Sequence, residues 1–378
     1  MDRIFNYVFK VKQERLHGFL FTFLKKYYGI ENIYHGTKFL MAKGTNPVAL
    51  IAHLDTVHRQ SNKDCLYYDP IKMVAWSPNG LGADDRAGVY AIIDIVKRGY
   101  RPHIIFTHDE ESGGGGARQL TGFNLPFVPN FLLELDRRGY QEAVFYDCDN
   151  KDFQEKIIKY GFKLGHGTFS DISIISPVYD IASANLGIGY YNEHTTFEVL
   201  HVDEMFDTIA RVIEIIEDEQ DSTVAYNFQK KVYSYTNYNR TYYGNSTYRQ
   251  EDDYDWDKWK SKDRNSTYVS TDEYNAKKNA ERNERKEDSV SETNEKILAR
   301  LELEDFDLST MGQWTQKELD RYYDLLYAEY TTESPTEWYD RYYPSEKITS
   351  QGNEFDGDPI TENINSVNAY LGREVMYG

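Results

Sequence analysis

The chain has 378 residues, and 43 Lys and Arg stand against 62 Asp and Glu, which makes the formal net charge −19. A chain this acidic, without a long basic stripe, would repel a phosphate backbone, so nucleic acid is excluded as an expected partner. Two cysteines, Cys65 and Cys148, are too few for a disulfide framework and indicate a reducing compartment. The apolar run Phe19–Leu24 is too short to cross a bilayer. We therefore expect a cytoplasmic protein with no membrane partner.

Up to residue 220 the chain alternates short apolar, β-branched runs with helical patterns, which is typical of an α/β domain built on a parallel sheet. The pattern predicts a three-layer fold in which helices cover both faces of a mostly parallel sheet. In chain order, the expected elements are the strand Val48–His53, the helix Asp85–Arg98, the strands His103–Thr107, Phe131–Leu135 and Ile181–Gly187, and the helix Asp203–Glu219.

The composition changes after residue 220, because residues 221–378 carry −12 of the net charge and 19 of the 33 tyrosines. Residues 221–291 almost lack aliphatic side chains and are predicted to form a disordered linker rich in Tyr, Asn and charged residues. Residues 292–345 are predicted to form a small helical segment, in which Thr315 and Glu318 form a capping box before a helix that ends near Tyr330. Residues 346–378 are expected to be a flexible tail. The helical segment either packs on itself or docks on a protein partner.

Polar residues that can bind metals follow the predicted strands. Parallel strands place their carboxyl ends at one edge of a sheet, where ligands bind, so these residues should converge. The set is His53, Asp84, Glu111, Asp136 and His194, with Asp55 and Glu110 beside them. Three carboxylates left uncompensated would repel one another, and they cancel most of the charge of two divalent cations. Because the set has nitrogen and oxygen ligands and no thiolate, it suits two Zn²⁺ ions, with Mn²⁺ or Co²⁺ as alternatives.

Three motifs, "AHLDTV", "GADDRAG" and "THDEESGGGGA", together with their order along the chain, resemble the co-catalytic di-zinc exopeptidase clan. This clan contains the tripeptidases and carboxypeptidase-like amidohydrolases, the leucyl-type zinc aminopeptidases and the glutamyl-type aminopeptidases. The motifs look most like the tripeptidase branch, and the resemblance covers residues 1–220 only. Each motif alone also has a structural interpretation, such as a strand-end histidine, a helix N-cap pair or a solvated turn.

The resemblance implies a role for each residue of the set. His53 and Asp136 would bind the first metal ion, Glu111 and His194 the second, and Asp84 would bridge both. Asp55 would fix the imidazole of His53, Glu110 would be the general base, and the peptide bond between Asp84 and Asp85 would be cis.

The chain departs from the clan in lacking an inserted lid. Only 58 positions separate Asp136 from His194, and 29 separate Asp55 from Asp84, too few for the insertions of the other branches. We therefore expect a bare catalytic domain and, by default, a monomer. The histidine that a lid usually supplies to stabilise an oxyanion would then be missing. Its candidate replacements are His166, Tyr190 and Tyr191, while Asp171 resembles a residue that opens a pocket-lining helix in two branches.

The predicted function is a zinc-dependent exopeptidase, either an aminopeptidase or a di- or tripeptidase, which acts on a peptide or small amide substrate. One alternative is an amidohydrolase that deacylates N-acyl amino acids or small amides with the same ligands. An alternative of another class is a structural or interaction protein that keeps a vestigial hydrolase domain. The combination of a minimal enzyme with a Tyr-rich extension resembles proteins of large bacteriophages in composition.

Overall fold

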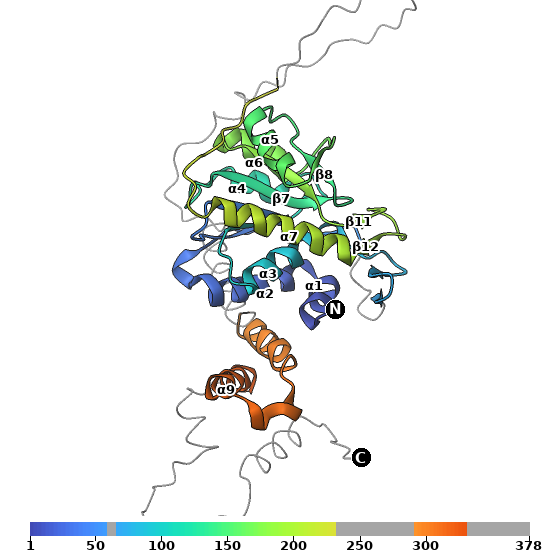
Figure 1. The fold of residues 1–378 in the computed structure, drawn as a ribbon, viewed down its shortest axis with the longest axis vertical. Helices are drawn as coiled ribbons and strands as arrows, with labels where there is room; N and C mark the ends of the chain where they lie inside the picture. Colours follow the sequence, from blue (N-terminus) through green and yellow to red (C-terminus); the bar gives the residue numbers. More distant parts are fainter. Residues whose placement is uncertain (59–65, 232–290, 331–378) are drawn as a thin grey trace, which may run out of the picture. The chain divides into compact units, whose positions relative to one another are not determined.

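The computed structural model describes residues 1–58, 66–231 and 291–330, and its centre is an eight-stranded mixed sheet (Figure 1). The strand order is β1-β2-β6-β3-β7-β10-β8-β9, and the four strands β6, β3, β7 and β10 run parallel. The strands are β1 (Ile33–His35), β2 (Phe39–Ala42), β3 (Val48–His53), β6 (His103–Thr107), β7 (Phe131–Arg137), β8 (Glu142–Val144), β9 (Lys163–Leu164) and β10 (Ser183–Gly187).

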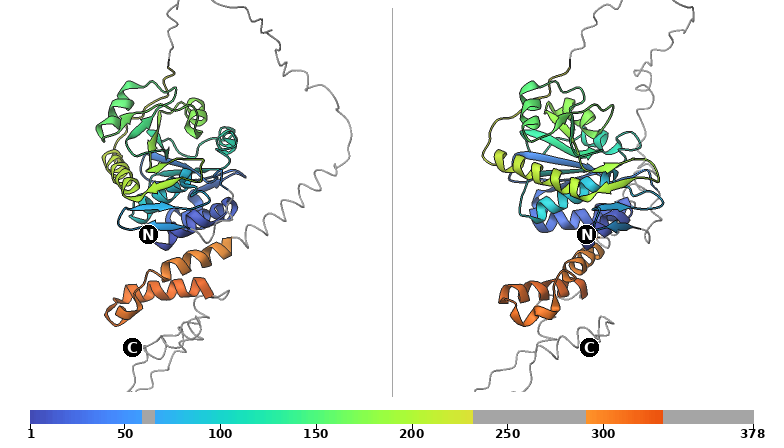
Figure 2. Two further views of the ribbon diagram at one scale, coloured as in Figure 1. Left: turned by 90° about the vertical axis from the view of Figure 1, so that its right-hand side faces the viewer. Right: turned by 45° about the vertical axis from the view of Figure 1, so that its right-hand side comes forward.

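Helices cover both faces of this sheet, as Figures 1 and 2 show. Leu50 and Ile51 are neighbours in β3, yet they belong to hydrophobic clusters on opposite faces, because successive strand residues point to opposite sides. The Leu50 face is covered by α1 (Arg3–Lys10), α2 (Gln13–Tyr28), α3 (Ala83–Lys97), α5 (Lys151–Lys159) and α7 (Val202–Glu219). The Ile51 face is covered by α4 (Gly115–Leu120) and α6 (Asp171–Tyr179). The predicted three-layer α/β fold is confirmed.

A second, four-stranded antiparallel sheet was not expected from the sequence. Its strand order is β11-β12-β5-β4, with β4 (Tyr67–Asp69), β5 (Val74–Trp76), β11 (Tyr190–Tyr191) and β12 (Val199–His201). Strands of two or three residues show no clear period-2 pattern, and this sheet joins segments more than 100 positions apart, Trp76 being paired with Val199. Residues 137–193 are all described, and their strands and helices belong to these two sheets and the helices that cover them. This part of the chain therefore contains no lid domain.

The predicted strands agree closely with the observed ones. β3 and β6 have the expected bounds, β7 continues two residues further to Arg137, and β10 begins at Ser183. α3 begins at Ala83, before the expected Asp85, because Asp84 and Asp85 have non-helical backbone angles at its start. No described helix combines the length and the apolar character that a membrane span requires.

Beyond α7 the described chain stays on the α/β unit as far as residue 231. The backbone N–H of Ala182 donates to Tyr226 O (2.8 Å), and that of Lys231 donates to Asp147 O (2.8 Å). The predicted catalytic unit ends earlier, at residue 220, and most of the predicted linker (232–290) and the predicted tail lie outside the described residues. The predicted boundaries of the four segments stay a prediction.

Near the C-terminus, residues 291–303 are helical, a 3-10 turn spans Leu308–Gln313, and α9 spans Gln316–Tyr330. The predicted capping box opens α9, because Thr315 N donates to Glu318 Oε2 (2.7 Å) and Glu318 N donates to Thr315 Oγ1 (3.4 Å). The ring of Trp314 lies 5.5 Å from that of Tyr322 and 5.1 Å from that of Phe306. These aromatic side chains therefore join α9 to the segment that precedes it, and the hairpin interpretation stays a prediction.

Candidate metal centre

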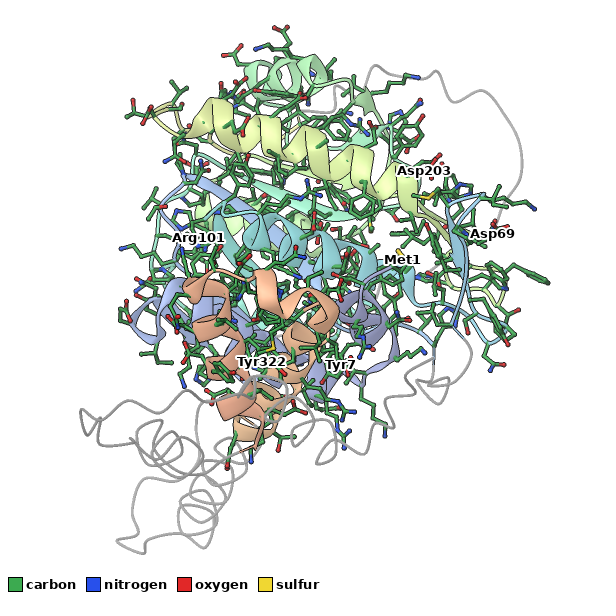
Figure 3. All side chains as sticks on the ribbon, turned by 60° about the horizontal axis from the view of Figure 1, so that its bottom comes forward. Met1, Tyr7, Asp69, Arg101, Asp203 and Tyr322 are labelled. Carbon is green, nitrogen blue, oxygen red and sulfur yellow. The ribbon has the colours of Figure 1, made fainter. Side chains whose placement is uncertain are left out.

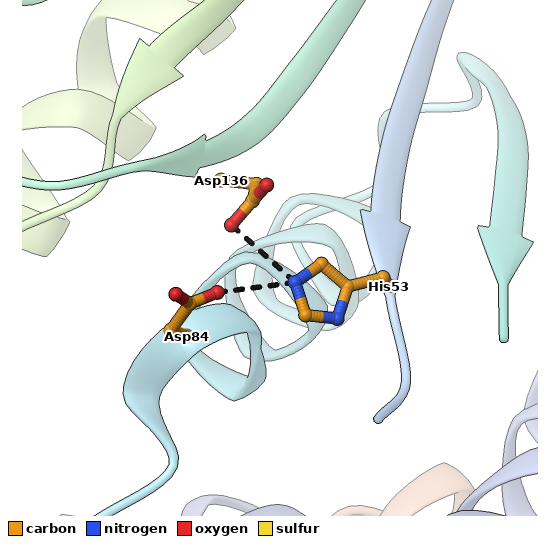
Figure 4. Close-up of side chains that lie close together, drawn as sticks. All are labelled: His53, Asp84 and Asp136. Atoms are coloured by element: carbon orange, nitrogen blue, oxygen red, sulfur yellow. Dashed lines mark hydrogen bonds and ion pairs between the residues drawn. The ribbon is translucent and has the colours of Figure 1, made fainter. Parts of the chain in front are cut away.

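The first group of possible ligands surrounds the side chain of His53, the last residue of β3. Its Nε2 lies 3.1 Å from Asp84 Oδ1 and 3.5 Å from Asp136 Oδ1, and Figure 4 shows the imidazole facing both carboxylates. Asp84 comes from the start of α3 and Asp136 from the end of β7. His53 is fully buried, and the two carboxylates are largely buried. One nitrogen and two oxygens therefore meet at the carboxyl edge of the sheet.

The second group shares Asp84 with the first. His194 Nε2 lies 3.1 Å from Asp84 Oδ2 and 2.9 Å from Glu111 Oε1. Within each three-residue group the ligand atoms lie within 4.8 Å of one another. Asp84 thus presents Oδ1 to one group and Oδ2 to the other, which is the geometry of a bridging carboxylate. The structure brings together all five residues that the sequence analysis selected as ligands.

The backbone at the start of α3 aims the carboxylates of Asp84 and Asp85 in different directions. The peptide bond between them is cis, as the family resemblance implies. Asp85 is fully buried, and it accepts hydrogen bonds from His53 N (3.2 Å) and Gly88 N (3.0 Å). Asp84 faces the histidines, while Asp85 ties the end of β3 to α3.

Asp55 contacts the other side of the His53 ring and also the loop that carries the glutamate pair. Its Oδ1 lies 3.3 Å from His53 Nδ1. The carboxylate accepts hydrogen bonds from the backbone N–H groups of Glu110 and Glu111, each at 3.1 Å. Burial alone would raise the pKa of Asp55, but these contacts outweigh it and hold the pKa below its usual value. Asp55 is therefore placed as an anion that orients both His53 and the Glu110 loop.

The electrostatics of the site favour bound cations. Burial raises the pKa of Glu110 and of Glu111 to about 7, and neighbouring carboxylates add to the effect. Burial and Asp84 also raise the pKa of Asp136 well above its usual value. The pKa values rise because it is costly to keep so many carboxylates charged together in a buried site. Divalent cations would remove that cost by compensating the charge.

The residues present fit a pair of divalent ions. Glu111 Oε1 is buried and accepts no hydrogen bond, although it faces His194. Two imidazole nitrogens and three carboxylates, without thiolate, form a ligand set for Zn²⁺, Mn²⁺ or Co²⁺. Glu110 belongs to neither group and stays beside them, held by Asp55 through its backbone.

The four residues predicted to bind substrate or stabilise an oxyanion are placed differently from one another. Tyr190 is buried, and its hydroxyl donates to Asp136 Oδ1 (3.2 Å), so it lies at the site. The hydroxyl of Tyr191 donates to Glu204 Oε2 (2.7 Å) on α7 instead. His166 is exposed and lines a separate cavity of about 290 Å³ beside β8 and α6.

Asp171, at the start of α6, is fully buried and accepts a hydrogen bond from the hydroxyl of Thr107, the last residue of β6. Burial raises the pKa of Asp171 to about 7. Asp171 therefore supports the end of β6 from the Ile51 face of the sheet.

Two residues that hold the site were missed by the sequence analysis. Asn185 in β10 clamps Asp136, because its Oδ1 accepts from Asp136 N (2.9 Å) and its Nδ2 donates to Asp136 O (2.9 Å). Glu198 is buried and accepts hydrogen bonds from Gly82 N (2.6 Å) and Asp84 N (3.0 Å). Neither residue stands in a recognisable motif, since each acts through a strand or loop that only the fold brings near the ligands.

No protein-family model matches the chain, and no curated protein matches it. Solved structures are similar to part of it. Aminopeptidase PepT from Bacillus cereus is 16% identical over 56% of this chain and 100% of its own, with a TM-score of 0.39. A leucine aminopeptidase precursor from Bacteroides thetaiotaomicron is 16% identical over 57% of this chain and 94% of its own, with a TM-score of 0.42.

Glutaminyl cyclase from Bacteroides thetaiotaomicron has the same identity of 16%, the same coverage of 57% and 94%, and the same TM-score of 0.42. Two of these three structures are described as aminopeptidases and the third as a glutaminyl cyclase. Likeness at this level says nothing about activity, so the chemistry is inferred from the side chains described above.

Proposed function

We propose that the protein is a metal-dependent exopeptidase, an aminopeptidase or a di- or tripeptidase, that hydrolyses a terminal peptide bond with two divalent ions, Zn²⁺ first. The observation that carries the proposal is the position of Asp84, whose two carboxylate oxygens each face a different group of ligand atoms. His53 and Asp136 would complete the first site, and Glu111 and His194 the second. The order of the motifs along the chain supports the exopeptidase class.

Glu110 is the proposed general base. When bound, the ions would lower the pKa of a water molecule and polarise the substrate carbonyl. Glu110 would take the proton of the attacking water and pass it to the leaving amine. A carboxylate that binds neither ion can make both transfers, and Glu110 belongs to neither ligand group. The backbone hydrogen bond from Glu110 to Asp55 (3.1 Å) holds the base beside the ligands without using its carboxylate.

Tyr190 supports the site rather than an oxyanion in this arrangement. Its hydroxyl donates to Asp136 (3.2 Å), which orients that carboxylate toward His53. The oxyanion would then be stabilised by the ions themselves together with a further donor.

The variant Glu110→Gln tests the proposal, with Asp109→Asn as a matched control. Asp109 is the preceding acidic residue, but its carboxylate pairs with Lys38 Nζ (2.8 Å) and belongs to neither ligand group. Metal content and turnover would be measured for the wild type and both variants, with and without a chelator, on short peptides and on N-acyl amino acids. We expect two divalent ions in all three proteins. Turnover of peptides should fall about 10²- to 10⁴-fold in Glu110→Gln alone.

Other results would point elsewhere. Turnover of N-acyl amino acids without turnover of peptides would replace the peptidase by a deacylase. Two bound ions without turnover of any amide would favour the interaction protein. A wild type that cleaves peptides while free of metal would refute the mechanism.

A further inference from the structure

Glu198 is a buried carboxylate that touches no ligand atom of the proposed metal centre. It lies between β11 and β12, only 1% of the residue is exposed, and its two oxygens have different backbone partners. Oε1 accepts from Asp84 N (3.0 Å), and Oε2 accepts from Gly82 N (2.6 Å). Glu198 therefore holds the backbone on both sides of Ala83, immediately before the bridging carboxylate.

The same carboxylate faces the loop that follows Asp55. His58 Nε2 lies 2.9 Å from Glu198 Oε2. The ring of His58 packs so closely on Gly80 that a Cβ there would come within 2.2 Å of it, and Gly80 has a φ of +92°. Thr56 packs against Gly82 in the same way, at 2.9 Å from an added Cβ. Three segments that carry proposed site residues thus meet around one carboxylate.

Glu198 also belongs to the turn that carries His194. The backbone N–H of Glu198 donates to Thr195 O (3.3 Å), and the hydroxyl of Thr195 donates to Asn192 O (2.7 Å). His194 itself has a φ of +63°, so its position depends on this turn being held. A displacement of Glu198 would therefore move His194 and the Asp84 backbone relative to each other.

A neutral acceptor could also satisfy two backbone N–H groups. A buried carboxylate beside an already acidic site costs free energy unless cations compensate it. Here the two N–H groups and the ring of His58 surround Glu198, and one of those N–H groups belongs to Asp84, the proposed bridging ligand. We interpret the carboxylate at this position as a firm hold on the Asp84 backbone, which metal binding by Asp84 requires.

We infer that Glu198 is a positioning residue that sets the register of Asp84 against His194 and thereby determines the affinity of the second metal site. The inference rests on the proposed function, because it assumes that Asp84, Glu111 and His194 bind an ion. It predicts that loss of the Glu198 carboxylate weakens metal binding at the two sites to different extents. His53 and Asp136 are positioned by β3 and β7, whereas His194 depends on the Glu198 turn.

The test is a zinc titration of the metal-free full chain, followed by calorimetry, with Glu198→Gln as the main variant. The variant His194→Ala identifies which binding step belongs to the second site. Glu219→Gln is the structural control. Glu219 is as buried as Glu198 and accepts from Asn130 Nδ2 (2.9 Å), but Asn130 precedes β7, at the opposite edge of the sheet. Glu198→Asp keeps the charge but withdraws the carboxylate by one methylene, and it serves if Glu198→Gln does not fold.

We expect Glu198→Gln to weaken the step lost in His194→Ala by about 10- to 100-fold, as loss of an orienting partner of a metal ligand typically does. The other step should weaken less, and Glu219→Gln should change neither. Glu198→Asp should act on the same step in the same direction. Unchanged zinc affinities in the Glu198 variants would overturn the inference and leave the proposed function standing. Equal weakening of both steps in the Glu198 and Glu219 variants would also overturn it. A wild type that takes up no zinc would instead refute the proposed function, and this inference with it.

Discussion

The variant Asp55→Asn tests the orienting role of Asp55, because asparagine keeps the size of the side chain but lacks its charge and one of its two oxygens. Asp55 Oδ1 faces His53 Nδ1 (3.3 Å) and accepts from Glu110 N (3.1 Å), while Oδ2 accepts from Glu111 N (3.1 Å). Asparagine has only one oxygen. Whichever way its amide is turned, one backbone N–H then faces an NH₂ group, and the negative charge beside His53 is lost.

The magnitude follows from these contacts. The Asp55 side chain is only 12% exposed, so the orphaned N–H group is not compensated by bulk water. Leaving a buried donor unsatisfied costs about 1–3 kcal/mol. If the Glu110 loop shifts to relieve that cost, metal affinity and turnover fall instead. A cost of about 1–3 kcal/mol corresponds to a decrease of about 5- to 150-fold. Removal of such an orienting carboxylate typically lowers metal affinity about 10- to 100-fold.

The assay is turnover at increasing free zinc, with Asp69→Asn as the control. Asp69 likewise accepts two backbone N–H groups, those of Ile71 (2.9 Å) and Lys72 (3.1 Å), but both bond to the same Oδ1, which asparagine retains. Figure 3 shows Asp69 near the surface, on the same side as Asp203 in the first turn of α7. Asp55→Asn should need more zinc and stay below wild-type turnover at saturation. Equal zinc dependence of the two variants would refute the proposed role of Asp55.

Three further predictions concern metal removal, Tyr190 and pH. A chelator should lower the melting temperature of the wild type, because the ions bind only the folded state and compensate its carboxylates; an unchanged melting temperature would argue against a resident metal. Tyr190→Phe removes one hydrogen bond to Asp136 and should weaken zinc binding about two- to tenfold, measured by titration; a change beyond that range, or none, would mean that the hydroxyl has another role. His17 Nδ1 lies 2.8 Å from His108 Nε2, and burial lowers the pKa of His17 to about 3. As the pH falls, His17 is therefore protonated in the unfolded chain before it is protonated in the folded chain. The contribution of neutral His17 to the free energy of unfolding is complete above a pH of about 6.5 and is lost as the pH falls toward 3. In urea unfolding between pH 7.5 and 5, His17→Gln should lose less stability than the wild type; parallel losses would contradict the assignment.

The strands of the main sheet were predictable because they are apolar and local in origin. Val48–His53 and His103–Thr107 are buried on both faces, so they appear as continuous apolar runs whose ends are visible in the sequence. The residues just after a parallel strand necessarily lie at its carboxyl edge. That rule was sufficient to select the segments that carry His53, Glu111 and Asp136, while the resemblance to the exopeptidase clan implied the role of each residue.

The direction of individual side chains was not predictable in this way. Tyr190 and Tyr191 are adjacent and chemically alike, yet one contacts Asp136 and the other contacts Glu204 on α7. They differ because successive residues of β11 point to opposite sides, and the orientation of β11 is set by its pairing with Val199–His201. No local pattern predicts that pairing.

The sequence by itself determined the fold class, the strands of the core and the residues that should converge at one edge of the sheet, because hydrophobic periodicity and strand polarity are properties of short segments. Only the tertiary structure decided how those residues are held. The backbone N–H of Asp84 donates to Glu198, 114 positions away, and Asp136 is clamped by Asn185 from the neighbouring strand. Such contacts join segments that meet only when the chain has folded, so they leave no spacing or composition signal along it.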